Sequence, residues 1–338
     1  MKNYPVVFVL LFANACTFSS KKTEIIIPER QYQTTGSIER IDPAINSLIS
    51  EDAEIEILAS GFDWSEGPVW IEDQQALIFS DVPENKIYRW SEKDSISVFL
   101  EPSGYFGERM DKHEPGSNGL TLDHDGNLLL CQHGARQIGR LKGSLKDPKP
   151  EFEILASGWE GKQFNSPNDL ALHSKGGVYF TDPPYGLDEW DKKELDFQGI
   201  YRLQDGELTL QIDSLNRPNG IALSPDEKIL YIAQSDAERA RYYAYDLDQN
   251  GQVISGRILL DISGMVSEEK KGLPDGLKVH SSGTIFATGP GGVLVISPEG
   301  KILGAIQTGQ ATANCGFDTE EKYLYMTADM HLMRIAIK

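Results

Sequence analysis

Short runs of alternating apolar and polar residues recur along most of the chain. Turn sequences such as DHDG, PDE and HSSG follow these runs, and second runs such as LIFSD and VYFTD come after the turns. Alternation with a period of two is typical of a half-buried β-strand, and two such runs joined by a tight turn are typical of a hairpin. The pattern therefore predicts a series of β-hairpins.

Six copies of this unit follow one another. They start at Ser65, Ser117, Pro167, Pro218, Pro274 and Ala313. The polar residues that lead them are Glu66, Asn118, Asn168, Asn219, Asp275 and Asn314. Successive leading residues are separated by 52, 50, 51, 56 and 39 positions. A repeat of this length, built only from strands, is typical of the blades of a β-propeller.

A third and a fourth strand follow the hairpin in most units. KIYRW and GIYRL are examples of the third, and SISVFL and EFEILA of the fourth. The sixth unit ends without its fourth strand, whereas EIEILASGF (54–62) closely matches EFEILASGW (151–159). We therefore expect an all-β fold: a six-bladed β-propeller over residues 53–338, with the last blade closed by an N-terminal strand.

The start of the chain has a different pattern. MKNYPVVFVLLFANAC carries a lysine, a short apolar run and small residues before Cys16, as secretory signals do, and the run is too short to span a bilayer. ANAC resembles a bacterial lipobox, in which the cysteine becomes lipidated. We expect residues 1–16 to be a lipoprotein signal peptide, residues 17–52 a flexible tether, and the protein a periplasm-facing, membrane-anchored lipoprotein. Plain secretion is the alternative.

Charge and cysteine content narrow the partners. The chain of 338 residues carries a net charge of −19, which argues against nucleic acid or an anionic membrane surface as a partner. An acidic channel mouth would attract cations instead. Cys131 and Cys315 either pair in an oxidising compartment or stay as buried thiols, and no CxxC spacing indicates zinc.

The leading polar residues carry the candidate chemistry. The first strand of each propeller blade lines the central channel, so these residues should gather at one face around one axis. Turn chemistry is the alternative explanation for any single copy. Converging carboxylate and amide oxygens without cysteine suit Ca²⁺, with Glu66 and Asp275 supplying charge and Asn168 and Asn219 neutral donors. Another divalent cation stays an alternative.

The second strand of each blade returns to the same face. QHG (132–134) places His133 there as a proton shuttle or substrate contact, although a rim histidine without contact to substrate is the alternative. TDPPYG (181–186) is stiffened by two prolines, and Tyr185 in this loop is expected to form part of the cavity wall.

Several motifs together resemble one known family. SEGPVW, GSNGLTLD, SPNDLAL with FTDPPYG, RPNGIALSPD and LPDGLKV, in this order from about residue 54 to the C-terminus, resemble the gluconolactonase–regucalcin family of calcium-dependent six-bladed propellers. The secreted bacterial lactonases look most similar. The resemblance implies calcium ligands at Glu66, Asn219 and Asp275, a ligand or substrate contact at Asn168, and Asp275 as general base.

One position departs from the family pattern. Animal members carry an arginine two places before the third-blade asparagine, where this chain has Ser166. A sugar-lactone contact of that kind is absent here, so the identity of the substrate stays open.

The combined expectation is a calcium-dependent, gluconolactonase-like hydrolase of lactones, with sugar lactones as the favoured small-molecule substrates. The metal would polarise the carbonyl, Asp275 or His133 would activate a water, and Asn118, Asn168 and Tyr185 would contact the substrate. A phosphotriester or fluorophosphate hydrolase on the same calcium site and a non-catalytic binding module are the alternatives. We expect a monomer.

Overall fold

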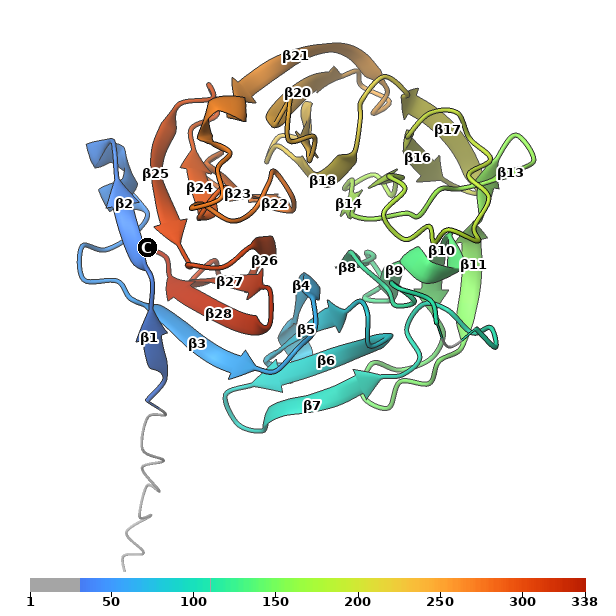
Figure 1. The fold of residues 1–338 in the computed structure, drawn as a ribbon, viewed down its shortest axis with the longest axis horizontal. Helices are drawn as coiled ribbons and strands as arrows, with labels where there is room; N and C mark the ends of the chain where they lie inside the picture. Colours follow the sequence, from blue (N-terminus) through green and yellow to red (C-terminus); the bar gives the residue numbers. More distant parts are fainter. Residues whose placement is uncertain (1–30, 110) are drawn as a thin grey trace, which may run out of the picture. The chain divides into compact units, whose positions relative to one another are not determined.

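Radially arranged antiparallel sheets surround a central channel in the computed structural model, which describes residues 31–109 and 111–338 (Figure 1). From the channel outward, the first four sheets contain β4 (Ser65–Ile71), β5 (Ala76–Asp81), β6 (Lys86–Ser91) and β7 (Ser95–Leu100); β8 (Leu120–Leu122), β9 (Leu128–Gln132), β10 (Gln137–Leu141) and β11 (Phe152–Ala156); β14 (Leu170–Leu172), β15 (Val178–Thr181), β16 (Ile200–Gln204) and β17 (Glu207–Ile212); and β18 (Pro218–Leu223), β19 (Ile229–Gln234), β20 (Arg241–Leu247) and β21 (Val253–Asp261).

The last two sheets have five strands each. They contain β22 (Leu277–Val279), β23 (Ile285–Gly289), β24 (Gly292–Ile296), β25 (Ile302–Gln307) and β2 (Ser37–Arg40); and β26 (Thr312–Phe317), β27 (Tyr323–Ala328), β28 (His331–Ala336), β3 (Ile55–Ser60) and β1 (Gln33–Thr35). A small hairpin consists of β12 (Gly158–Trp159) and β13 (Lys162–Gln163). Within the described residues, the helical elements are the 3₁₀ turns η1 (Pro43–Ser47), η2 (Glu72–Gln74), η3 (His133–Ala135) and η4 (Ser263–Met265).

The alternation of apolar residues places each blade between two cores. Leu128 and Leu130 of β9 pack in one cluster with Ile78 of the first blade. The intervening residues of the same strand, Leu129 and Cys131, pack toward the third blade instead. Successive side chains of a strand point to opposite faces, so one strand contributes to the core on either side of its blade.

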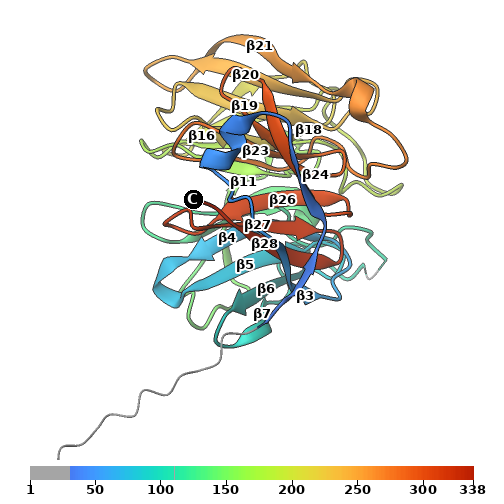
Figure 2. The same cartoon turned by 90° about the vertical axis from the view of Figure 1, so that its left-hand side faces the viewer.

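The ring closes as the sequence predicts. β3 pairs antiparallel with β28, with Ile55 opposite Ile335, and β26 of the last blade contacts β4 of the first. Figures 1 and 2 show the N-terminal strand β3 lying beside the C-terminal strand β28. The six-bladed propeller closed by an N-terminal strand is thereby confirmed.

The predicted tether is wrong from about residue 33 onward. β1 pairs with β3, and β2 pairs with the outer strand β25 of the fifth blade. Ile45 and Ile49, which follow, have no exposed surface and pack between the last two blades. These apolar side chains bind the segment to the propeller, since leaving them in water would forgo about 1.5–3 kcal/mol each. The predicted signal peptide and Cys16 lie outside the described residues.

The inner strands approach one another closely around the channel. The amide of Gly119 donates to the carbonyl of Asn168 (2.7 Å), and the amide of Gly220 donates to that of Asp275 (3.2 Å). A Cβ atom at Gly220 would lie 2.2 Å from the Asp275 carbonyl oxygen. At Gly220 a side chain would therefore prevent the two neighbouring inner strands from approaching this closely.

Two smaller expectations concern cysteines and membrane segments. Cys131 and Cys315 are buried and free, as one of the two predicted alternatives has it. Among the described residues, no helix is long and apolar enough to cross a membrane.

Candidate functional site

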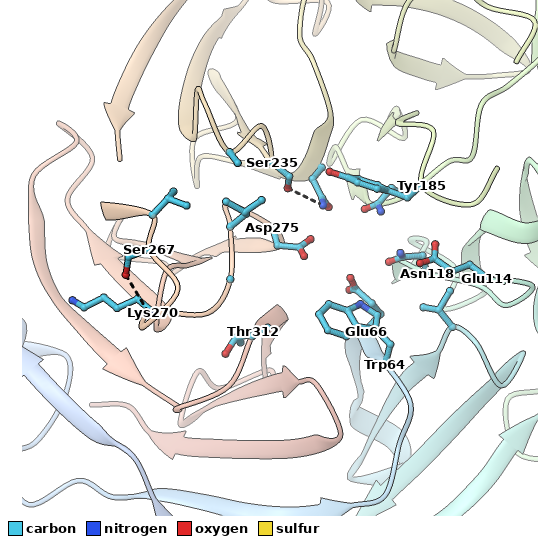
Figure 3. Close-up of a pocket in the computed structure, with 18 residues that line it drawn as sticks. Trp64, Glu66, Glu114, Asn118, Tyr185, Ser235, Ser267, Lys270, Asp275 and Thr312 are labelled. Carbon is cyan, nitrogen blue, oxygen red and sulfur yellow. Dashed lines mark hydrogen bonds between the residues drawn. The ribbon is translucent and has the colours of Figure 1, made fainter. Parts of the chain in front are cut away.

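A cavity of about 460 Å³ opens at one end of the channel (Figure 3). Its walls consist of Trp64, Glu66, Val82, Glu114, Asn118, Asn168, Tyr185, Asn219, Ser235, Ala237, Val266, Ser267, Lys270, Gly272, Leu273, Asp275, Ala311 and Thr312. Five of the six predicted leading residues are among them. Register-matched positions at or just before the starts of the inner strands therefore converge on one cavity.

Two carboxyl groups face one another across the cavity, those of Glu66 and Asp275 (Figure 3). Glu66 is 2% exposed and accepts a hydrogen bond from the amide of Gly67 (3.0 Å). Burial, followed by the charge of Asp169, raises the pKa of Glu66 to about 7. Burial, followed by the charge of Glu66, raises the pKa of Asp275 well above its usual range. Two negative charges here repel one another and favour a cation between them.

Three buried asparagines surround these carboxyl groups. Asn219 donates from Nδ2 to Ser235 Oγ (3.1 Å), and this hydroxyl donates to the carbonyl of Pro274. That bond orients the Asn219 amide and leaves its Oδ1 as an acceptor. The Oδ1 of Asn118 is buried without a hydrogen-bond partner, as is one carboxylate oxygen of Asp275. The third asparagine, Asn168, lines the cavity with 3% of its surface exposed.

The sixth leading residue lies outside the cavity wall. Asn314 donates from Nδ2 to Asp169 Oδ2 (3.3 Å), while its Oδ1 accepts from the amide of Cys315 (2.9 Å). Lys278 Nζ lies 3.5 Å from Asn314 Oδ1 and 3.9 Å from Asp169 Oδ2. Asn314 thus belongs to a charged network with Asp169 and Lys278. Asp169 was not predicted as a site residue, although it directly follows Asn168 in the sequence.

The structure does not place His133 in the cavity wall. Its side chain has no exposed surface, Nδ1 lies 3.0 Å from the carbonyl oxygen of Pro167, and Nε2 lies 2.9 Å from Glu114 Oε2. His133 thus matches the predicted alternative of a histidine without direct contact to the cavity, because Glu114 is the residue of this pair that lines it. Glu114 was not predicted, because it precedes the second repeat, in the connection between β7 and β8.

Tyr185 forms part of the wall, as predicted. Its ring lies under the Arg217 guanidinium (5.9 Å to the centroid), and burial raises the pKa of its hydroxyl to about 12. Ser166 holds this loop, donating to the carbonyl of Pro183 (2.6 Å) and accepting from the amide of Gly186 (2.9 Å). Ser166 is fully buried and outside the cavity wall, so it braces the loop that carries Tyr185.

The donor set fits a hard divalent cation. Buried oxygens without hydrogen-bond partners, on Asp275 and Asn118, point to a missing positively charged or donor group. In the described part of the chain, no three His, Cys, Asp or Glu side chains gather closely enough to hold a metal by themselves. The two carboxylates therefore need amide oxygens from Asn168 and Asn219 to complete a site, an all-oxygen set that suits Ca²⁺.

A family model matches most of the chain. The model of the SMP-30/Gluconolactonase/LRE-like region matches residues 64–329. A gluconolactonase of Zymomonas mobilis is 38% identical over 315 residues, which cover 90% of this chain and 87% of that protein.

Solved structures share the fold. A gluconolactonase of Xanthomonas campestris superposes with a TM-score of 0.79 at 29% identity, over 93% of this chain and 99% of that one. A calcium-binding protein, regucalcin, of Agrobacterium tumefaciens reaches a TM-score of 0.65 at 17% identity, over 83% of this chain and 94% of that one. The second likeness concerns the fold alone.

Proposed function

Because this chain belongs to the SMP-30/gluconolactonase/LRE-like family, we propose that it hydrolyses sugar lactones of the gluconolactone type with the help of a bound Ca²⁺. The activity follows from the gluconolactonase relatives. Calcium is supported by the carboxylate and amide oxygens that line the cavity, two of which, on Asp275 and Asn118, have no hydrogen-bond partner. Glu66, Asn168, Asn219 and Asp275 would hold the ion.

The single observation that carries the proposal is the pair of carboxyl groups in the cavity. Glu66 and Asp275 face one another there, and one oxygen of Asp275 has no partner. Among the described residues that line the cavity, the only basic side chain is that of Lys270, which is exposed. A bound cation would balance the two charges, and a cavity of about 460 Å³ suits a small molecule.

Hydrolysis needs an activated water and a held substrate. When bound, the cation supplies positive charge that polarises the lactone carbonyl. Asp275 takes a proton from the attacking water, since its carboxylate faces the cavity. Asn118 and Asn168 hydrogen-bond the substrate, and Tyr185 bounds it on one side.

A substrate panel with and without EDTA tests this proposal. We expect calcium-dependent hydrolysis of glucono-δ-lactone above its uncatalysed rate, slower hydrolysis of aliphatic lactones and none of phosphotriesters. Glu66→Gln should abolish both activity and calcium binding measured by calorimetry, whereas Glu299→Gln, at an exposed site, should change neither. Full activity of the metal-stripped protein would contradict the calcium assignment, and turnover of phosphotriesters alone would replace the lactonase assignment.

We also propose that the protein is an exported lipoprotein. The support is the signal-like sequence before Cys16, which lies outside the described residues. When cells are labelled with a clickable fatty acid, the wild type should carry the label and Cys16→Ser should not. Cys16→Ser should also be absent from the membrane fraction. Equal labelling of both proteins would refute lipidation at Cys16.

A further inference from the structure

The cavity contains one carboxyl group that the proposed calcium site does not use. Glu114 lines the cavity, and its side chain is 23% exposed. Its Oε2 lies 2.9 Å from Nε2 of His133, whose side chain has no exposed surface. The pair therefore has one member in contact with the cavity and one member shielded from water.

The contacts of His133 determine where the protons are. The carbonyl oxygen of Pro167 can only accept, so Nδ1 of His133, 3.0 Å away, must carry a proton. In the neutral tautomer that carries its proton on Nε2, the lone pair of Nδ1 would face the carbonyl oxygen of Pro167, and the two would repel one another. The contact between Nε2 and Glu114 then needs one further proton, on either the ring or the carboxyl group. In both forms the pair holds a transferable proton beside the cavity.

The loop around Glu114 fixes the position of this pair. The amide of Tyr105 donates to the carbonyl of Pro115 (2.7 Å), and the amide of Gly116 donates to that of Val82 (2.9 Å). Lys112, two residues before Glu114, is nearly buried and donates to Asp191 (2.7 Å). Both sides of Glu114 are thus tied to neighbouring segments, and its carboxyl group is preorganised.

His133 is held as firmly from the opposite side. A Cβ atom at Gly186 would lie 2.4 Å from Cδ2 of the His133 ring, so the ring packs directly against the backbone of the Tyr185 loop. With Pro167 on one ring nitrogen and Glu114 on the other, the imidazole has a single orientation. It is a positioning residue that acts through Glu114.

We propose that Glu114 is the general acid of lactone hydrolysis and that His133 supplies and orients its proton. This inference rests on the proposed function. Water adds to the carbonyl carbon while Asp275 takes one of its protons, and the bond between that carbon and the ring oxygen then breaks. The electron pair stays on the ring oxygen, which takes the proton from Glu114. The proton on Asp275 returns to the pair through solvent, and the product is the open-chain hydroxy acid.

The chemistry of the leaving group distinguishes this role from a structural one. The ring oxygen of a sugar or aliphatic lactone leaves as an alkoxide, whose conjugate acid has a pKa roughly like that of water, about 16. The ring oxygen of dihydrocoumarin leaves as a phenolate, with a conjugate acid near about 10, like tyrosine. An acid catalyst is needed far more for the first than for the second.

The experiment compares kcat and KM for both lactones in four proteins. Glu114→Gln should lower kcat on δ-valerolactone by about 100-fold or more and on dihydrocoumarin by less than about 5-fold, with smaller changes in KM. His133→Asn should show the same split. Glu321→Gln is the matched control, since Glu321 lies 3.3 Å from His280 outside the cavity wall and should change neither rate.

Several results would overturn the inference. Equal losses on both lactones, or no loss in Glu114→Gln, would show that Glu114 is not the acid. If the wild type does not hydrolyse dihydrocoumarin, a second test adds formate to Glu114→Ala as a replacement acid. Restored hydrolysis of δ-valerolactone would support Glu114 as the general acid, and no restoration would refute it. A wild type that hydrolyses no lactone at all would instead refute the proposed function, before any variant is compared.

Discussion

Asp182, which directly follows β15, provides a test of how burial changes the titration of a carboxyl group in this fold. Its side chain has no exposed surface, and Oδ2 accepts a hydrogen bond from the amide of Asn165 (2.8 Å), whereas Oδ1 has no partner. Burial raises the pKa of Asp182 from 3.8 to about 7, against smaller opposing effects of its hydrogen bonds. The carboxyl group therefore keeps its proton in the folded protein at pH values where the unfolded chain has lost it.

The sign of the effect on stability follows directly. A raised folded-state pKa contributes stability that is complete below the unfolded value of 3.8 and is lost as the pH rises through about 7. Between pH 5 and about pH 7 the Asp182 carboxyl is protonated in the folded protein and ionised in the unfolded chain. These two pH units lower the free energy of unfolding by about 3 kcal/mol, and little further change follows up to pH 8. Wild type should therefore lose about 3 kcal/mol over this range relative to Asp182→Asn, whose side chain does not titrate.

Urea unfolding at pH 5 and pH 8 at constant ionic strength and with EDTA measures this difference. Both proteins share every other titrating group, so the change in their free-energy difference isolates Asp182. Asp213→Asn, at an exposed site, is the control and should show a pH-independent difference. The same difference between wild type and Asp182→Asn at both pH values would refute the reasoning, because the folded-state carboxyl would then titrate as in the unfolded chain.

Three further predictions concern packing around the site and the N-terminal segment. Gly186→Ala should cost about 1–3 kcal/mol and lower kcat, because its Cβ would overlap the His133 ring; an unchanged Tm would contradict this packing. Ile45→Ala should cost about 2–5 kcal/mol in urea unfolding, and a neutral Ile45→Ala would mean that the segment around Ile45 does not stabilise the propeller. Lys112→Met should lower stability by about 1.5–3 kcal/mol, because it removes a charged hydrogen bond to Asp191, and an unchanged free energy of unfolding at low salt would show that this bond does not stabilise the fold.

The repeats made the propeller and most of its cavity predictable. The leading residues share a register, and strands alternate their faces, so Glu66, Asn219 and Asp275 were placed without a structure. The rest depends on contacts that no repeat encodes. Glu114 comes from the connection between β7 and β8, outside the repeated motif, and only packing shows that His133 lies behind it.

The N-terminal strands show a second limit of sequence reasoning. β1 and β2 are short and largely exposed, and their pairing depends on the free edges of β3 and β25 that accept them. Polar, edge-paired segments of this kind have the composition of a linker. A partner strand, which for β2 lies far away in the sequence, determines where these segments pack. The predicted flexible tether, residues 17–52, therefore included strands that belong to the fold.

Closure of the ring by β3 and β28 also sets the order of events during synthesis. Ile55 and Ile335 come from opposite ends of the folded unit, so their pairing waits until the last strand is available. Contacts between residues so far apart in sequence form slowly, because a long loop must first be ordered. A nascent chain, or one clipped before β28, leaves β3 and β27 as open edges that invite pairing with other chains. The cavity takes its donors from blades that the closing strand holds in a ring, so its donor set is complete only once β28 has been made.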